Sequence, residues 1–296
     1  MTLAKMALLP DRGVVRVAGE DAWKLLQGTV TNDMALLDSQ AALHAALLTP
    51  QGKVLFEFFA AKAADGGFLL ETAIDQVGSL VRRLTMYKLR AKADIADATT
   101  DYRVLALWGD APVCHGPTAR TVGPFQDPRL EALGVRVLAE ARFASDIASS
   151  TNGSEQTAEA YHAHRIALGV PEGGKDYPLG DTFPHEANLD VLGGVSFTKG
   201  CFVGQEVVSR VQHRRSARKR IVIVESDGPL ETGAEVMAGT ATIGAVGSVA
   251  GRRALALLRL DRAQEATAKG EELSAGGRRI AMRVPDYLKS VQAAAS

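Results

Sequence analysis

The most specific pattern in this sequence is Lys199-Gly200-Cys201-Phe202-Val203-Gly204-Gln205-Glu206-Val207-Val208-Ser209-Arg210, a thiol between glycines followed by the start of an expected helix. Cys201 is one of only two cysteines, and a free cysteine taken alone is more often a small buried hydrophobe than a reactive group. Three features favour reactivity here. Lys199 can stabilise a thiolate, Gly200 permits unusual backbone torsions, and a helix beginning near Gly204 presents its positive end. We therefore expect a functional thiol at Cys201.

The expected helix also places two opposite charges on one face. Glu206 and Arg210 are four residues apart, which is about one helical turn. Such a pair is either a solvated ion pair that contributes roughly a few tenths of a kcal/mol, or a partly buried pair that orients a ligand. The spacing is compatible with both.

The densest charge cluster of the chain follows directly, in Arg214-Arg215-Ser216-Ala217-Arg218-Lys219-Arg220, where five of seven residues are basic. In a chain of zero net charge, such a run is usually solvated or paired with acids elsewhere. The alternatives are contact with a polyglutamate tail or with RNA phosphates. No aromatic residue interleaves with the basic ones, which weakens the case for single-stranded RNA.

Composition narrows the function classes. The chain has 296 residues, 46% of them hydrophobic, and is long enough for two units. Two cysteines exclude a secreted disulfide scaffold and cannot supply the four thiolates of an ordinary iron–sulfur cluster. No zinc-ligand pattern, P-loop, signal peptide or membrane-spanning run is present. We expect a cytoplasmic protein that binds neither a resident metal nor a membrane.

Local patterns predict an α+β chain rather than a repeating βαβ series. Strands are expected over 14–17, 53–61, 68–72, 93–95, 103–108 and 135–139, and helices over 20–27, 75–84 (with Asp75 as N-cap) and 155–168. The polar stretch 145–154 is typical of a linker and 169–198 of ordered loop. Short β-like pieces after residue 220 predict a small C-terminal β-barrel. The predicted domains are 1–215 and 216–290.

These residues are specific enough to indicate a family. Residues 199–206 with Arg210 resemble the K-G-C-[FY]-x-G-Q-E-x-x-x-R signature of the YgfZ family, folate-binding relatives of the glycine cleavage T protein. Three further segments are similar to family motifs: Leu26-Gln27-Gly28-Thr29-Val30-Thr31-Asn32-Asp33, Thr49-Pro50-Gln51-Gly52-Lys53 and Pro184-His185-Glu186-Ala187-Asn188-Leu189. The resemblance covers most of the chain and implies a T-protein-like fold of several parts with a small C-terminal β-barrel.

The resemblance also implies tetrahydrofolate, or a one-carbon derivative of it, as the cofactor. A carboxylate suits the pterin's aminopyrimidine edge because it accepts two parallel N–H bonds, and Glu186 occupies the matching acidic position. T proteins carry an Asp-Asp pair where this chain reads Leu55-Phe56-Glu57-Phe58, so Glu57 keeps only one acid. The other residues that we assign to the cofactor by resemblance are Asn32, Gln205 and Arg210.

Three functions follow from the resemblance. The first is a folate-binding accessory factor in iron–sulfur cluster assembly or repair, with effects on tRNA modification, in which Cys201 contacts a cluster or a client or assembly protein. The second is an aminomethyl- or methyltransferase of the T-protein kind, which the incomplete acid pair opposes. The third is an RNA-contacting module that uses residues 214–220. Whether the protein is an enzyme is left open by the sequence.

Overall fold

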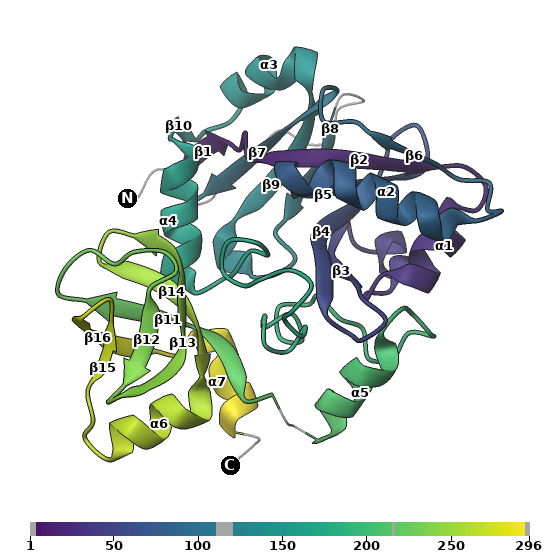
Figure 1. Cartoon of the computed structure of the whole chain (residues 1–296). Helices are drawn as coiled ribbons and strands as arrows, with labels where there is room; N and C mark the ends of the chain where they lie inside the picture. The colour runs from purple at the N-terminus through teal and green to yellow at the C-terminus, as the bar shows by residue number, and fades with distance from the viewer. Residues whose placement is uncertain (1–3, 111–120, 215–216, 294–296) are drawn as a thin grey trace. The chain divides into compact units, whose positions relative to one another are not determined.

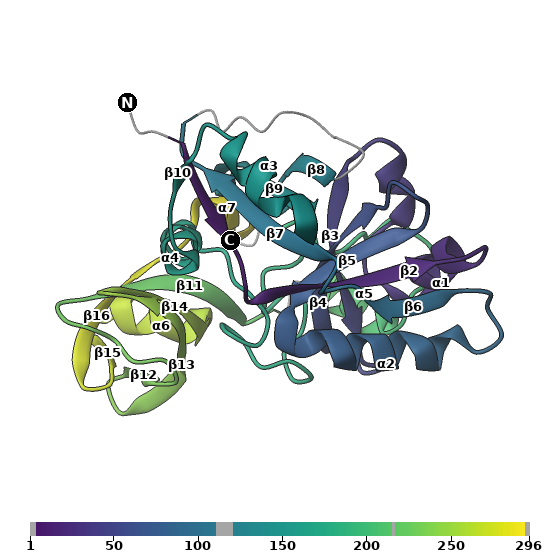
Figure 2. The same ribbon diagram turned by 90° about the horizontal axis from the view of Figure 1, so that it is seen from above.

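The computed structural model describes residues 4–110, 121–214 and 217–293. Cys114, for which the sequence suggests a structural role, and Arg215 and Ser216 of the basic run lie outside them. The chain divides into two compact units. Unit 1 holds 1–48, 56–161 and 193–203, and unit 2 holds 49–55, 162–192 and 204–296. Figures 1 and 2 show the ribbon of the chain in two views.

Unit 1 is built on two five-stranded sheets. The first has the order β10 (Ser154–Glu155), β1 (Lys5–Leu8), β7 (Tyr102–Trp108), β9 (Val135–Glu140), β8 (Thr121–Gln126). The second has the order β3 (Ala42–Leu48), β4 (Val54–Lys62), β5 (Phe68–Ala73), β2 (Arg12–Ala18), β6 (Asp94–Asp97). Continuous runs of buried side chains in β3, β7 and β9 explain why these strands are central to the core.

Three helices accompany these sheets: α1 (Ala22–Thr29), α2 (Val77–Lys88) and α3 (Ala144–Ser149). The spacing predicts an apolar stripe of Val77, Leu80, Val81 and Leu84 on α2, and all of these are buried except Val81, which is half-buried. The predicted N-cap at Asp75 is wrong, because Gln76 is the cap residue and a 3₁₀ turn, Ile74–Gln76, precedes it. The linker or loop expected over 145–154 is wrong in part, because α3 covers 145–149 and the edge strand β10 begins at Ser154, while 150–153 belong to neither.

A buried cluster of charges lies within unit 1. Arg136 donates to Glu71 Oε1 at 2.5 Å and to Asp127 Oδ2 at 3.0 Å, while Arg129 makes two side-chain bonds to Asp127, at 2.9 and 3.0 Å. The ring of Phe59 lies 4.6 Å from the Arg136 guanidinium and 4.7 Å from that of Arg129. Each carboxylate in this cluster is therefore neutralised by arginine, as burial of charge requires.

The cluster predicts sensitivity to acid. Burial alone would raise the pKa of Asp127, but the guanidiniums of Arg129 and Arg136 outweigh it and hold that pKa well below its usual value. In the unfolded chain the carboxyl returns to a pKa of about 3.9. Its contribution to stability is therefore present above pH ~4 and is lost as the pH falls further. We expect Asp127→Asn to flatten the fall in unfolding free energy between about pH 5 and 3, measured by urea unfolding; an unchanged slope would contradict this account.

Unit 2 contains the C-terminal barrel. Its closed strand order is β11 (Lys219–Ser226), β14 (Arg253–Arg259), β13 (Ala241–Ala250), β12 (Glu235–Ala238), β15 (Leu273–Ala275), β16 (Arg278–Arg283). The interior is filled by aliphatic side chains such as Val222, Leu258 and Ile280. The remaining helices are α4 (Ala158–Leu168), α5 (Gln205–Arg214), α6 (Leu260–Ala268) and α7 (Asp286–Ala293). The predicted α+β content and C-terminal barrel are thus present, and no described helix is both long and apolar enough to cross a bilayer.

Candidate functional site: a lysine-clamped loop with an exposed thiol

Lys199 fastens the signature loop to a distant segment of unit 1. Its ammonium donates to the backbone carbonyls of Gln27 at 2.7 Å, Val30 at 2.8 Å and Asn32 at 2.8 Å. An ammonium has three donors, so these three bonds use all of them. The lysine therefore has no N–H donor left for the thiol of Cys201, and the electrostatic role predicted for it stays a prediction.

Neighbouring bonds reinforce the same junction. The Thr31 hydroxyl donates to the carbonyl of Gly194 at 2.6 Å, and the Ser196 N–H donates to the carbonyl of Thr31 at 3.0 Å. The Asn32 amide donates to the carbonyls of His44 and Gly193, both at 2.7 Å. Asn32, predicted to contact the cofactor, thus has both amide protons committed to backbone, and its cofactor role stays a prediction. Residues 27–32 and 193–199, more than 160 positions apart, are thus held together by hydrogen bonds. We call this junction the Lys199 clamp.

Burial also affects the Lys199 amine itself. Desolvation lowers its pKa to about 8, and the nearby Asp33 carboxylate opposes part of that shift. At pH 7 the amine is therefore mainly protonated, which is the form that can satisfy three carbonyls at once. The clamp is thus fully hydrogen-bonded at neutral pH.

Cys201 lies just beyond the clamp and is exposed to solvent. Phe202 beside it is buried, and its ring centroid lies 5.4 Å from the Lys199 ammonium. Gly200 has no positive φ and a Cβ there would meet no atom within 4 Å, so the predicted need for unusual torsions at Gly200 is wrong. The demanding position is Gly204, with φ 82°, immediately before α5. The thiol is accessible on a loop held firmly from its N-terminal side.

In unit 2, α5 carries the rest of the signature. Glu206 and Arg210 form an ion pair at 2.7 Å with side chains 85% and 55% exposed, so of the two interpretations of their spacing the solvated pair is present. Val208 is buried, and Val207 lies so close to Gly52 that a Cβ on Gly52 would come within 2.9 Å of it. Gly52, with φ 79°, therefore lets the 49–53 turn pack against α5. Gln205 starts the helix and is half-buried.

The segment around Glu186 contacts the 49–53 turn and α5. The Lys53 ammonium lies 3.6 Å from the Phe183 ring centroid, and Glu186 Oε2 accepts the Phe183 N–H at 2.9 Å. His185 Nε2 lies 2.9 Å from Gln212 Oε1 on α5, and burial lowers the pKa of His185. Sequence reasoning did not single out Lys53 as a site residue, although its place in the glycine turn was the available clue.

Glu57, the other predicted acid, lies in unit 1. Its Oε1 is 2.8 Å from His44 Nε2, and the His44 ring is buried. Phe56 and Phe58 on either side are buried as well, so Glu57 is the acidic residue of this stretch of β4. His44 was not predicted, because nothing in the sequence joins β3 to β4 at this register.

The basic run separates into different roles. Arg220 is buried and donates to Asp190 Oδ1 at 2.6 Å, to Asp190 Oδ2 at 2.9 Å and to the carbonyl of His185 at 2.6 Å. Arg218 and Lys219 are exposed. Arg220 is therefore an internal tie of unit 2 rather than a contact for phosphate, which weakens the RNA interpretation.

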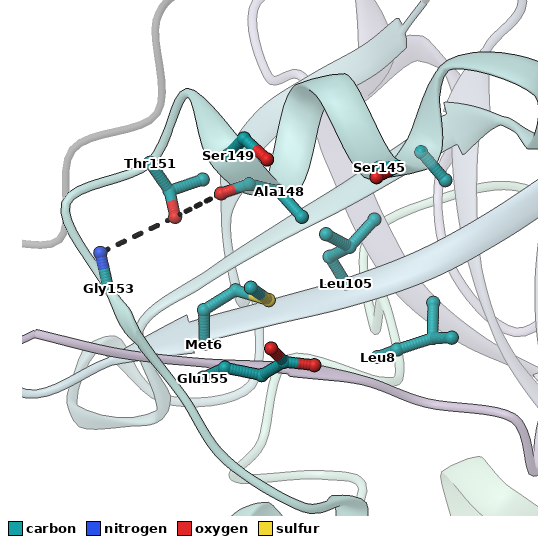
Figure 3. Close-up of a pocket in the computed structure, with 10 residues that line it drawn as sticks. Met6, Leu8, Leu105, Ser145, Ala148, Ser149, Thr151, Gly153 and Glu155 are labelled. Carbon is teal, nitrogen blue, oxygen red and sulfur yellow. Dashed lines mark hydrogen bonds between the residues drawn. The ribbon is translucent and has the colours of Figure 1, made fainter.

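A separate pocket of about 460 Å³ lies in unit 1 beside α3 (Figure 3). Met6, Leu8 and Leu105 form its apolar side, and none of its lining residues is a predicted site residue. The Thr151 hydroxyl there donates to the carbonyl of Ala148 at 2.9 Å and accepts from the Gly153 N–H at 3.4 Å. These bonds fix the turn that follows α3, and the pocket is separate from the Lys199 clamp and from Cys201.

Comparison with known proteins defines the class. The chain superimposes on glycine cleavage system aminomethyltransferase T from Bartonella henselae with a TM-score of 0.73 over 95% of this chain and 85% of that one, at 19% identity. Residues 218–290 match the family model of the CAF17 C-terminal beta-barrel domain. The predicted T-protein-like α+β fold with a C-terminal barrel is thus confirmed. An identity this low shows the fold alone.

Sequence relatives define the family. The chain is 33% identical over 268 residues to iron-sulfur cluster assembly factor IBA57 of Mus musculus, covering 82% of this chain and 72% of that protein. For Homo sapiens the values are 32% over 274 residues, 84% and 76%. The chain belongs to the IBA57 family of iron–sulfur cluster assembly factors. It spans 56% of the length of the homologue in Mycosarcoma maydis, to which it is 38% identical.

These findings refine two expectations. The resemblance to YgfZ is correct at the level of a T-protein-like iron–sulfur assembly factor, while the matching relatives are named IBA57. The expected cytoplasmic location is wrong, because those relatives are named as mitochondrial proteins. Cysteine usage, on which that expectation rested, does not distinguish the cytosol from mitochondria.

Proposed function

We propose that this protein acts in iron–sulfur cluster assembly by offering the Cys201 thiolate as one ligand to a cluster that is completed by a partner protein. The observation that carries the proposal is the exposed thiol on a loop that the Lys199 clamp holds in place. Thiolates are the usual ligands of iron–sulfur clusters. With two cysteines in the chain, a partner must supply the remaining ligands.

The clamp gives this role a physical basis. A ligand that is exposed but fixed loses little conformational entropy when it binds. Lys199 fixes the loop two residues before the sulfur, while its own charge is satisfied by backbone carbonyls. On coordination the thiol would release its proton to solvent and the sulfur would take one position on iron.

Replacing Cys201 tests this proposal. In cells lacking the native protein, we expect Cys201→Ser to abolish recovery of iron–sulfur enzyme activity while leaving the amount of folded protein unchanged. Ser209→Ala, in α5, is the matched control and should restore activity fully. Full recovery with both Cys201→Ser and Cys201→Ala would overturn the role of the thiol.

We further propose that the protein binds tetrahydrofolate or a one-carbon derivative through Glu186, Glu57, Asn32, Gln205 and Arg210. Support comes from the family resemblance and from two carboxylates that are each steadied by one neighbour, the Phe183 N–H or His44. Titration with tetrahydrofolate tests this, with Glu186→Gln expected to weaken binding by about 10- to 100-fold, the loss of one charged hydrogen bond. Wild-type protein that shows no binding would remove the folate role and leave the thiol role untouched.

An aminomethyltransferase activity is the alternative. Its support is the shared fold, and the single acid Glu57 between buried phenylalanines argues against it. Formation of methylene-tetrahydrofolate from an aminomethylated lipoyl carrier would favour the alternative. Contact with RNA through Arg218 and Lys219 has weaker support, and binding that resists added salt would contradict it.

A further inference from the structure

The C-terminal end of α2 exposes two large apolar side chains that the proposed function does not use. Leu89 is 87% exposed and Met86 is 66% exposed, more than any other large hydrophobic residue among the described residues. Met86 lies in the last turn of α2, and Leu89 is the residue that directly follows the helix. The side chains of α2 that are buried in unit 1 are others, so neither Met86 nor Leu89 contributes to the core of that unit.

Leu89 is also held in an unfavourable backbone conformation. Its φ of 48° and ψ of −107° fit the first central position of a type II′ turn, which the Ala91 N–H closes on the carbonyl of Lys88 at 2.7 Å. Glycine is the residue that suits this position. A leucine there gains nothing from packing and adds strain, and strain of this kind is typical of functional positions.

Positive charge surrounds the two side chains. Residues 82–92 contain five basic side chains, and no acid occurs between Asp75 and Asp94. Lys92 pairs with Glu20 at 2.9 Å, and Arg82 donates to the Ser79 hydroxyl. Among the residues that the structure describes, the other three basic side chains form no ion pair: Arg83, Lys88 and Arg90. In a chain of zero net charge, the end of α2 therefore carries three cations that no ion pair neutralises among the described residues.

α1 lies next to this end of α2 and carries an exposed aromatic ring. The two helices are in contact, and both views place α1 beside the C-terminal end of α2 (Figures 1 and 2). Asp21, at the start of α1, accepts the Lys92 N–H at 2.8 Å. Trp23, two residues further along, is 45% exposed. Tryptophan, methionine and arginine are the residues enriched where proteins bind one another.

From these observations we infer that the end of α2 is a docking surface for an acidic protein segment, one that carries aspartates or glutamates around one or two apolar side chains. We call the surface the α2 patch and define it as Trp23, Arg83, Met86, Lys88, Leu89 and Arg90. Its unpaired cations complement acidic groups, and Met86 and Leu89 supply the apolar contact. The inference stands independently of Cys201 and of folate.

A protein partner fits the α2 patch better than a membrane or a nucleic acid. A helix that lies on a membrane needs a long apolar face, whereas the apolar stripe of α2 is buried and only its last turn is free. A nucleic acid could use the cations and the Trp23 ring, but the exposed aliphatic side chains of Met86 and Leu89 would contribute nothing to that contact. Two aliphatic side chains between cations match an acidic amphipathic helix.

The probe is a fluorescein-labelled 16-residue helical peptide with leucines along one face and glutamates elsewhere, titrated with the full chain by fluorescence anisotropy at low salt. We expect binding in the micromolar range that weakens with added salt. Arg83→Glu with Lys88→Glu, and separately Met86→Ser with Leu89→Ser, should each weaken binding at least about 10-fold. Ile74→Ser, an exposed residue at the other end of α2, and Arg252→Glu in the barrel are the matched controls and should change it less than about twofold.

Leu89→Gly separates binding from a structural role. Glycine removes the strain, so this variant should unfold at a higher urea concentration than the wild type while it binds the peptide more weakly. A lower urea midpoint would show that Leu89 is structural and would overturn its assignment to the patch. Failure of the acidic peptide to bind, equal binding of a lysine-for-glutamate peptide, or tighter binding to phosphatidylserine vesicles or poly(U) would overturn the inference.

Discussion

Lys199→Met should lower the free energy of unfolding by about 3–5 kcal/mol, because it leaves three carbonyl oxygens without their donor and each unsatisfied buried group costs about 1–3 kcal/mol. These oxygens are the backbone carbonyls of Gln27, Val30 and Asn32. Methionine fills a similar volume, so the loss reports hydrogen bonds rather than a cavity. Urea unfolding at pH 7 measures the change.

Cys201→Ser is the control for this prediction. The side chain of Cys201 is exposed, so its replacement should change the unfolding free energy by less than about 0.5 kcal/mol. Both variants should lose activity in cells, Lys199→Met through loss of folded protein and Cys201→Ser with normal amounts of it. A Lys199→Met protein as stable as the wild type would show that the clamp is dispensable.

Lys199 also shows where sequence reasoning about the site ends. A lysine two residues from a cysteine predicts a local electrostatic partner, because proximity along the chain is all that a sequence displays. The lysine instead binds carbonyls about 170 positions earlier. Sequence motifs identified both segments separately, at 26–33 and at 199–206. Nothing in their composition indicates that one binds the other, because backbone carbonyls are present at every residue.

Sequence reasoning about the fold has a similar limit. Elements with a clear period were predicted well, such as α2 with its buried stripe and the short strands of the barrel. β3 was missed because both of its faces are buried, so its run Ala42–Leu48 lacks the alternation of a half-exposed strand. α3 was taken for a linker because its serines and its asparagine-glycine neighbours are typical of loops. Only packing against β7 and β9 identifies it as a helix.

The second large effect is expected at Arg220. Arg220→Met should lower the free energy of unfolding by about 3–5 kcal/mol, because it leaves the Asp190 carboxylate, with its side chain only 6% exposed, without its partner. Asp190→Leu should cost a similar amount, because it leaves the buried Arg220 guanidinium without its carboxylate partner. The double variant Arg220→Met with Asp190→Leu removes both charges, so it should be more stable than the sum of the single changes predicts. Urea unfolding of the four proteins completes the cycle.

Arg218→Gln with Lys219→Gln is the matched comparison, because these neighbours belong to the same basic run but are exposed. We expect their unfolding free energy to stay within about 0.5 kcal/mol of the wild type. If the basic run contacts RNA, Arg218→Gln with Lys219→Gln should reduce RNA binding. Arg220 should not contribute to RNA binding, because its guanidinium is engaged in bidentate bonds to Asp190. An Arg220→Met protein of wild-type stability would mean that the Arg220–Asp190 ion pair contributes no net stability. Arg220 would then no longer differ in role from Arg218 and Lys219. Burial therefore separates the residues of this basic segment: Arg220 stabilises the fold, whereas Arg218 and Lys219 remain exposed to solvent.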